Sequence, residues 1–115
     1  MKKTAICMLL IGFSSIAFST VDEYQLEGLI GWTILASKTI EGVTEEDGER
    51  KDDFEGCDFG RVIRFMDGTV LTCNSYGYQY AFMPKAIVFG TTTTYKGKEV
   101  TLYKILVQGN LYDAY

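Results

Sequence analysis

Within residues 73–89, large aromatic side chains occupy every second position from Tyr76 to Phe82. The run begins Cys-Asn-Ser-Tyr-Gly-Tyr-Gln-Tyr-Ala-Phe and contains the only proline, Pro84. Successive side chains of an extended strand point to opposite faces, so this alternation predicts that the aromatic residues share one face of a strand. We call these four side chains the aromatic row: Tyr76, Tyr78, Tyr80 and Phe82.

The aromatic row has two interpretations. Tyrosines on one face of a strand complete the core of a small β-domain, with their hydroxyl groups at its rim. Exposed tyrosines instead form a binding surface, because each offers a rigid ring with a polar tip. We favour the core, and expect Tyr76 to be the member that reaches solvent. The candidate binding residues on the second interpretation are Tyr76, Tyr78 and Tyr80.

The N-terminal segment has the three parts of a secretory signal peptide. Lys2 and Lys3 give a positive start, residues 5–18 are almost all apolar, and small residues precede a cleavage point before Thr20. The apolar run is shorter than the roughly 20 residues that a membrane-spanning helix needs. We therefore predict a cleavable signal at residues 1–19, with an uncleaved anchor as the alternative. The destination would be the bacterial periplasm or the exterior.

Removal of the signal leaves a chain long enough for one domain, residues 20–115. The signal takes two of the 11 basic residues, so 9 remain against 15 acidic residues, a net charge of −6. A negative protein surface repels phosphate backbones and anionic lipid headgroups. We therefore expect neither nucleic acid nor a membrane to be a partner of the mature domain.

Two cysteines, Cys57 and Cys73, lie outside the predicted signal. In an oxidising compartment such a pair forms a disulfide. A metal site would need further ligands, and the chain contains no histidine. The spacing of the two cysteines also differs from the Cys-x-x-Cys of redox couples. We predict a structural disulfide that stabilises the domain by roughly 3 kcal/mol.

Residues 41–58 carry nine acidic residues and two basic ones. An EF-hand calcium loop needs acids and a glycine at fixed spacing, and alignment on Gly48 or on Gly56 leaves the first and last ligand positions without acids. We predict an exposed, mobile acidic loop, with a weak cation site or a contact for a basic partner as alternatives. The residues of such a contact would be Glu45, Glu46 and Asp47.

The rest of the mature chain consists of short β-prone segments separated by turn signals. The predicted strands are residues 29–40, 61–66, 69–74, 100–108 and 111–115, with residues 91–98 as a loop whose first residues, Thr91 to Thr94, could begin as strand. These segments predict an all-β domain, a small antiparallel barrel or roll of five to six strands, SH3-like in kind.

Two dipeptides predict tight hairpin turns. Asp67-Gly68 is the pair that a two-residue type I′ turn prefers, and such a turn would pair Phe65 with Val70. Gly109-Asn110 predicts a second two-residue turn near the C-terminus.

The sequence offers little for catalysis. Without histidine, the histidine-dependent triads, dyads and zinc sites are excluded. A carboxylate pair remains as an alternative, as in glycosidases. The acids outside the dense part of the loop are Asp58, Asp67, Glu99 and Asp113, and no spacing selects a pair among them. We predict no catalytic residues, no metal and no cofactor.

We therefore predict a small exported binding or protein-interaction module with an unknown protein or saccharide as its partner. One alternative is an inhibitor or immunity-type protein that blocks a basic enzyme site with its acidic loop. A second alternative is a small carboxylate-dependent hydrolase.

Overall fold

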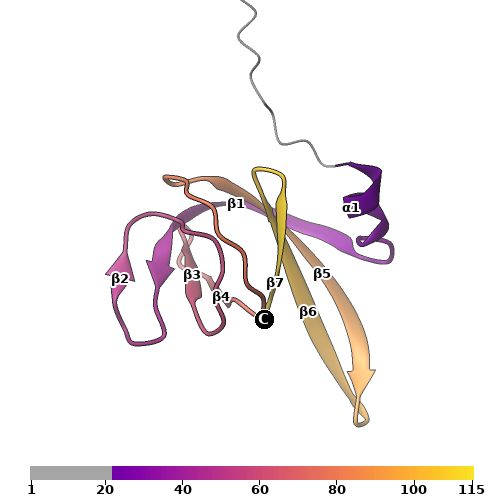
Figure 1. The fold of residues 1–115 in the computed structure, drawn as a ribbon. Coiled ribbons are helices and arrows are strands. Elements are labelled where there is room, and N and C mark those ends of the chain that lie inside the picture. Colours follow the sequence, from indigo (N-terminus) through magenta and orange to yellow (C-terminus); the bar gives the residue numbers. More distant parts are fainter. Residues whose placement is uncertain (1–21) are drawn as a thin grey trace, which may run out of the picture.

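The computed structural model describes residues 22–115, which form an antiparallel sheet preceded by a short helix (Figure 1). In chain order the elements are α1 (Glu23–Glu27), β1 (Thr33–Thr44), β2 (Arg50–Lys51), β3 (Val62–Phe65), β4 (Val70–Thr72), β5 (Lys85–Tyr95), β6 (Lys98–Val107) and β7 (Asn110–Ala114). Neighbouring strands follow the order β4-β3-β1-β5-β6-β7, and β2 pairs with β1. The signal peptide predicted at residues 1–19 lies outside the described residues.

The first and last strands of the sheet meet at one point. The amide of Thr72 donates to the carbonyl of Tyr115 (2.8 Å), and the amide of Tyr115 donates back (2.9 Å). Next to them, the amide of Asn74 donates to the carbonyl of Asp113 (2.8 Å). The sheet is therefore curled into a half-barrel whose edges touch where β4 and β7 end. This confirms the predicted all-β class, antiparallel and with six strands along the sheet.

β1 is the strand that joins the two halves of the sheet. Its first half pairs with β5 and its second half with β3. It runs to Thr44, four residues beyond the predicted end, because Ile40 and Val43 are both fully buried and extend the apolar face into the acidic stretch. Burial of each such side chain contributes about 1.5–3 kcal/mol.

The hairpin of β3 and β4 has a different turn from the predicted one. Arg64 lies opposite Val70, and the amide of Phe65 donates to the carbonyl of Thr69, which leaves three residues in the turn. Gly68 adopts a φ of +87°, as the last position of a three-residue hairpin turn requires.

The shift of one residue changes which side chains of β4 face the core. Leu71 now lies opposite the buried Ile63, while Val70 is exposed. The Asp67 side chain stabilises the turn by accepting hydrogen bonds from the amide and hydroxyl of Thr69. These bonds, followed by one from Lys38, hold the pKa of Asp67 well below its usual range.

The predicted loop at residues 91–98 is instead a continuous hairpin. β5 runs to Tyr95, turns at Lys96-Gly97 and returns as β6. Beyond Gly90, β5 pairs only with β6, so the outer part of the hairpin projects from the barrel (Figure 1). We call residues 91–102 the arm. The last turn is at Gln108-Gly109, one residue before the predicted dipeptide, because Val107 pairs with Asn110.

Candidate functional site

The aromatic row lies on an extended segment between β4 and β5 that runs beside β7 (Figure 1). We call this segment, residues 74–84, the strap. All four side chains of the row are exposed, by 71% (Tyr76), 71% (Tyr78), 60% (Tyr80) and 69% (Phe82). The predicted alternation is therefore present, but the favoured core interpretation is wrong.

The reason for this exposure is the size of the residues on the other face of the strap. Ala81 is buried, and a Cβ atom on Gly77 would lie only 2.8 Å from the Tyr112 ring. The Tyr112 ring in turn packs edge-to-face against Phe54, with 5.8 Å between the ring centres. Because these two rings fill the space beneath Gly77 and Ala81, only small residues fit at these two positions, and the aromatic side chains point outward.

Backbone hydrogen bonds fix the strap to the end of the acidic stretch. Phe54 and Ala81 exchange two of them (2.8 and 2.9 Å), and Cys57 and Gly77 exchange two more (2.8 and 3.0 Å). The strap is thus a short added strand, although its main-chain bonds are too few for it to count among the seven strands.

Gln79 anchors the middle of the strap from its inner side. Its side-chain oxygen accepts hydrogen bonds from the hydroxyl of Tyr112 and from the side-chain amide of Asn110 (3.3 Å). Burial raises the pKa of Tyr112 to about 12, so its hydroxyl stays protonated and can donate at neutral pH. Sequence reasoning missed this role of Gln79, since its partners lie more than thirty residues away.

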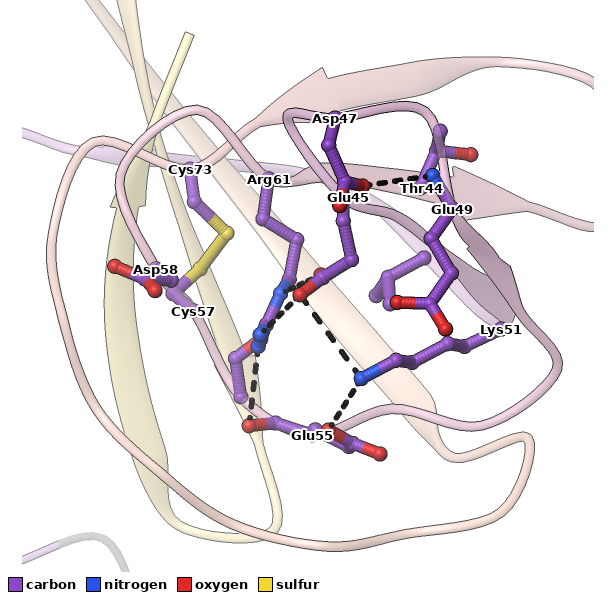
Figure 2. Close-up of polar contacts among 12 residues, drawn as sticks. Thr44, Glu45, Asp47, Glu49, Lys51, Glu55, Cys57, Asp58, Arg61 and Cys73 are labelled. Carbon is purple, nitrogen blue, oxygen red and sulfur yellow. Dashed lines mark hydrogen bonds and ion pairs between the residues drawn. A yellow bond between two sulfur atoms is a disulfide. The ribbon is translucent and has the colours of Figure 1, made fainter.

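The Cys57–Cys73 disulfide joins the start of the strap to the segment that supports it. The two Cα atoms are 5.5 Å apart and both residues are buried. Figure 2 shows the disulfide beside the polar network of the acidic stretch. The predicted pairing is confirmed. It links the residue just before the strap to the end of the acidic stretch, which hydrogen-bonds to the strap.

Arg61 is buried and binds several groups of the acidic stretch (Figure 2). Its guanidinium forms two bonds with the Glu45 carboxylate, from Nε and from Nη2 (3.0 Å). Nη1 donates to the carbonyl of Gly56 (3.0 Å) and to that of Glu55 (3.3 Å). Lys51 Nζ lies 3.2 Å from Glu55 Oε1. Planar bidentate pairs such as that of Arg61 and Glu45 are among the stronger polar contacts in proteins.

A second buried arginine, Arg64, holds the start of the stretch. It donates to the hydroxyl of Thr44 (2.9 Å), the carbonyl of Lys51 (3.1 Å) and Glu41 Oε1 (3.1 Å). The predicted exposed loop at 41–58 is therefore largely ordered, with parts in β1 and β2. The sequence signal for this order is the pair of arginines in the following segment, Arg61 and Arg64, each of which pairs with a carboxylate of the stretch.

The three predicted contact residues of the acidic loop do not act as one group. Glu45 is paired with Arg61, and this hydrogen bond lowers the pKa of the Glu45 carboxyl. Glu46 and Asp47 lie at a turn, where Asp47 Oδ1 accepts from the amide of Glu49 (2.9 Å). They border a depression of about 250 Å³ that is also lined by Asp58, Phe59 and Arg61.

An apolar depression of about 270 Å³ lies at another part of the surface, between β1, β5 and the β3–β4 hairpin. Its charged group is Lys38, whose Nζ already binds Asp67 Oδ2 (2.9 Å) and the hydroxyl of Thr69 (2.7 Å). The remaining lining residues include Leu35, Phe65, Leu71, Val88 and Tyr103. The depression offers apolar contact but its lysine is engaged within the protein.

The carboxylates considered for catalysis lie on separate elements. Asp67 belongs to the β3–β4 turn, Glu99 to the arm, and Asp113 to β7, where it pairs with Lys104. Asp58 is exposed beside the disulfide. Among residues 22–115, no group of three or more cysteine or carboxylate side chains is arranged to hold a metal ion.

In the same described range, no helix is both long and apolar enough to cross a membrane. Comparison with known proteins found no matching family model, no matching curated protein and no matching solved structure.

Proposed function

We propose that the mature domain is an exported binding module and that the aromatic row is its contact surface. One observation carries this proposal: four large aromatic side chains are exposed on a segment whose other face is fixed to the core. Protein and saccharide sites both use rigid aromatic area with a polar tip. A surface that is already held in place also loses little conformational entropy when it binds.

The disulfide supports export, because such bonds form and persist mainly in oxidising compartments. The signal-like N-terminus agrees with a periplasmic or secreted destination. N-terminal sequencing of the exported protein tests this, and we expect Thr20 as its first residue. Retention of Met1 in exported material would contradict the cleavage.

The inhibitor alternative has one observation in its favour. Glu46 and Asp47 lie at the tip of the acidic stretch, where a basic enzyme site could be contacted. Its contact is smaller than predicted, because Glu45 is committed to Arg61. We therefore place the aromatic row first.

Capture of partners from periplasmic extract on the immobilised, oxidised domain tests the proposal. The test variant is Tyr76→Ser/Tyr80→Ser, and the matched control is Tyr24→Ser/Tyr95→Ser, which changes two exposed tyrosines on α1 and the arm. We expect the test variant to lose a partner that the wild type and the control retain. Equal capture by all three proteins would remove the row from the binding surface.

A third variant, Glu46→Ser/Asp47→Ser, separates the two functions. An inhibitor that acts through its acidic tip would lose a stoichiometric basic enzyme with this variant and keep it with the row variant. The binding module that we propose gives the opposite pattern.

A further inference from the structure

Two pairs of residues define how the strap lies against the end of the acidic stretch. Phe54 lies opposite Ala81, and Cys57 lies opposite Gly77. Phe54, Cys57 and Ala81 are buried, so both pairs face the core. Because side chains alternate along an extended strand, the positions next to each pair face outward.

This register places one acidic residue beside each of three members of the aromatic row. Continued by one position from each of the two pairs, the register places Asp58 opposite Tyr76, Glu55 opposite Tyr80 and Asp53 opposite Phe82. Residues directly opposite one another in an antiparallel pair have Cβ atoms about 4.5–5.5 Å apart. The strap and its neighbour thus carry two adjacent rows, one of aromatic rings and one of carboxylates. We call Asp53, Glu55 and Asp58 the carboxylate row.

The carboxylate row has unused capacity for a cation. One oxygen of Asp53, Oδ1, is shielded from water and has no hydrogen-bond partner in the described part of the chain. Asp58 is exposed, with Oδ1 accepting from the amide of Phe59 (2.9 Å). A shielded carboxylate oxygen without a partner costs free energy, which Asp53 recovers when its side chain turns this oxygen toward a donor. Asp58 is the member of the row that a ligand reaches without such a rearrangement.

Charge around the rows favours a basic ligand. The nine acids of residues 41–58 face four basic groups, Arg50 and Lys51 within the stretch and the buried Arg61 and Arg64 beneath it. The difference of nine and four leaves a local charge of −5. Such a field attracts cationic partners and speeds their association.

The fold holds two of its own lysines with the same pair of groups. Lys104 Nζ lies 5.0 Å from the centre of the Trp32 ring and forms an ion pair with Asp113 (2.5 Å). A ring and a carboxylate together therefore make a lysine site in this protein, with attraction to both the ring face and the charge. Lys38 has the same two kinds of contact, to Phe65 and Asp67.

We infer that the aromatic row binds an extended protein segment with Lys or Arg at alternate positions, an inference that rests on the proposed function of the row. Alternate residues of an extended strand are spaced about 6.6 Å apart, which is also the spacing along the row. The ammonium or guanidinium groups bind Asp53 and Asp58, because Glu55 is already paired with Lys51 (3.2 Å). The aliphatic part of the same side chain packs on the neighbouring ring.

Fluorescence anisotropy with labelled decapeptides tests this inference on the oxidised mature domain. The probes are a peptide of alternating Lys and Ser and its Gln-Ser and Glu-Ser counterparts. We expect the Lys-Ser peptide alone to bind, and binding to weaken as salt is added because exposed ion pairs are screened. A saccharide probe, chitohexaose, is added as a competitor.

Four variants, each checked for wild-type thermal unfolding, locate the site. Tyr76→Ser/Tyr80→Ser and Asp53→Asn/Asp58→Asn should each weaken Lys-Ser binding by about tenfold or more, because each removes one of the two contacts. The matched controls are Tyr24→Ser/Tyr95→Ser and Asp22→Asn/Glu99→Gln, which make the same kinds of change away from the rows. Both controls should bind like the wild type.

Three results would overturn the inference. Equal loss in the test and control variants would show general attraction to an acidic protein. Displacement by chitohexaose, or equal binding of the Gln-Ser peptide, would show a ligand that does not need the charges. Absence of Lys-Ser binding, together with row-dependent capture from extract, would reject the cationic segment while the row remained a binding surface.

Discussion

Gly56 allows the strap to lie against the end of the acidic stretch. It adopts a φ of +83°, and a Cβ atom at this position would be 2.0 Å from the carbonyl oxygen of Gly77. Both the backbone conformation and the available space therefore require glycine here. Gly56 lies between the hydrogen-bonded pairs at Phe54 and Cys57, so it controls how closely the strap approaches.

Replacement of Gly56 by alanine should lower the free energy of unfolding by about 2–5 kcal/mol. About 1–2 kcal/mol comes from the left-handed conformation, and about 1–3 kcal/mol from the clash with the strap. Gly48→Ala is the control, since Gly48 has a φ of +98° but, apart from its own chain neighbours, no residue of 22–115 lies within 4 Å of where its Cβ would be. Urea unfolding measures both variants. Equal losses would mean that the strap yields easily to the added methyl group.

Glu45 links the stability of the acidic stretch to pH. The hydrogen bond from Arg61 lowers the pKa of Glu45 in the folded protein, below its ordinary value of 4.5. The folded state therefore favours the ionised carboxylate, and this contribution is complete above the unfolded pKa. It is lost as the pH falls through 4.5 and then through the lower pKa of the folded state.

Glu45→Gln should consequently cost most at neutral pH, about 2 kcal/mol for the lost charged hydrogen bonds. The difference in unfolding free energy between wild type and variant should shrink as the pH is lowered from about 6 towards about 3, a window set by the ordinary glutamate pKa of 4.5 and the lower pKa of Glu45 in the folded state. Chemical denaturation at several pH values measures this difference. A difference that stays constant with pH would show that the Glu45 charge does not stabilise the fold.

The two faces of the strap have different roles: we expect the outward side chains to bind a partner and the inward ones to stabilise the fold. Its outward rings contact solvent, while its inner residues contact Tyr112 and the segment around Phe54. Changes on the two faces of this one segment should therefore have opposite consequences. Outward changes should alter binding alone, and inward changes should alter folding.

Tyr76→Ser and Tyr80→Ser should each change the free energy of unfolding by no more than about 0.5 kcal/mol, as for other exposed residues. Tyr112→Ala should cost about 3–5 kcal/mol, because it leaves a cavity beneath Gly77. Thermal unfolding discriminates the two cases, since each kcal/mol corresponds to about 4–8 °C in a domain of this size. A large loss for Tyr76→Ser would restore the core interpretation.

The two hairpins show that a turn dipeptide predicts where a turn lies but not the register of the strands that it joins. Both predicted turn regions contain a turn, but each turn is one residue away from the predicted pairing. A dipeptide such as Asp67-Gly68 is compatible with two-residue and three-residue turns, because glycine accepts a positive φ in both. Packing selects between them, and in β4 it selects the register in which Leu71, and not Val70, packs against the core.

Residues 91–98 of the arm lack the hydrophobic alternation that distinguishes a strand from a loop, whereas residues 100–102 belong to a predicted strand. The threonines and lysines of the arm are polar on both faces, and all its residues except Thr91 are exposed. The hairpin extends because the inner halves of β5 and β6 are packed in the barrel and continue outward in register. Period-two hydrophobicity, the usual strand signal, is absent where neither face meets a core.

At the scale of the whole molecule, the disulfide joins the end of the acidic stretch to the place where the two edges of the half-barrel meet. Cys73 bonds Cys57 and also bridges to Ala114 of β7, beside the meeting point of the first and last strands. One covalent bond thus fixes the acidic stretch, the strap and the curled sheet together. Its loss should affect binding as well as folding.

The double variant Cys57→Ala/Cys73→Ala should lose roughly 3 kcal/mol of unfolding free energy, the value expected for a closed loop of about 15 residues. Partner capture by the aromatic row should weaken at temperatures where the protein stays folded, because the supports of the strap become free to move. Denaturation and capture are measured on the same preparation. Retained capture with lower stability would show that the remaining contacts suffice to hold the row.

Local patterns in the sequence were sufficient for the fold class, the disulfide and the alternation of the strap. Strand propensity and period-two alternation depend on neighbouring residues, and two cysteines outside the predicted signal allow one pairing. Contacts between distant segments determined which face of the strap is exposed. Alternation shows that two faces differ, but the rings of Phe54 and Tyr112, which occupy the space beneath, come from segments far from the strap in sequence on either side. For the same reason, the aromatic row became visible as a surface only in the folded protein.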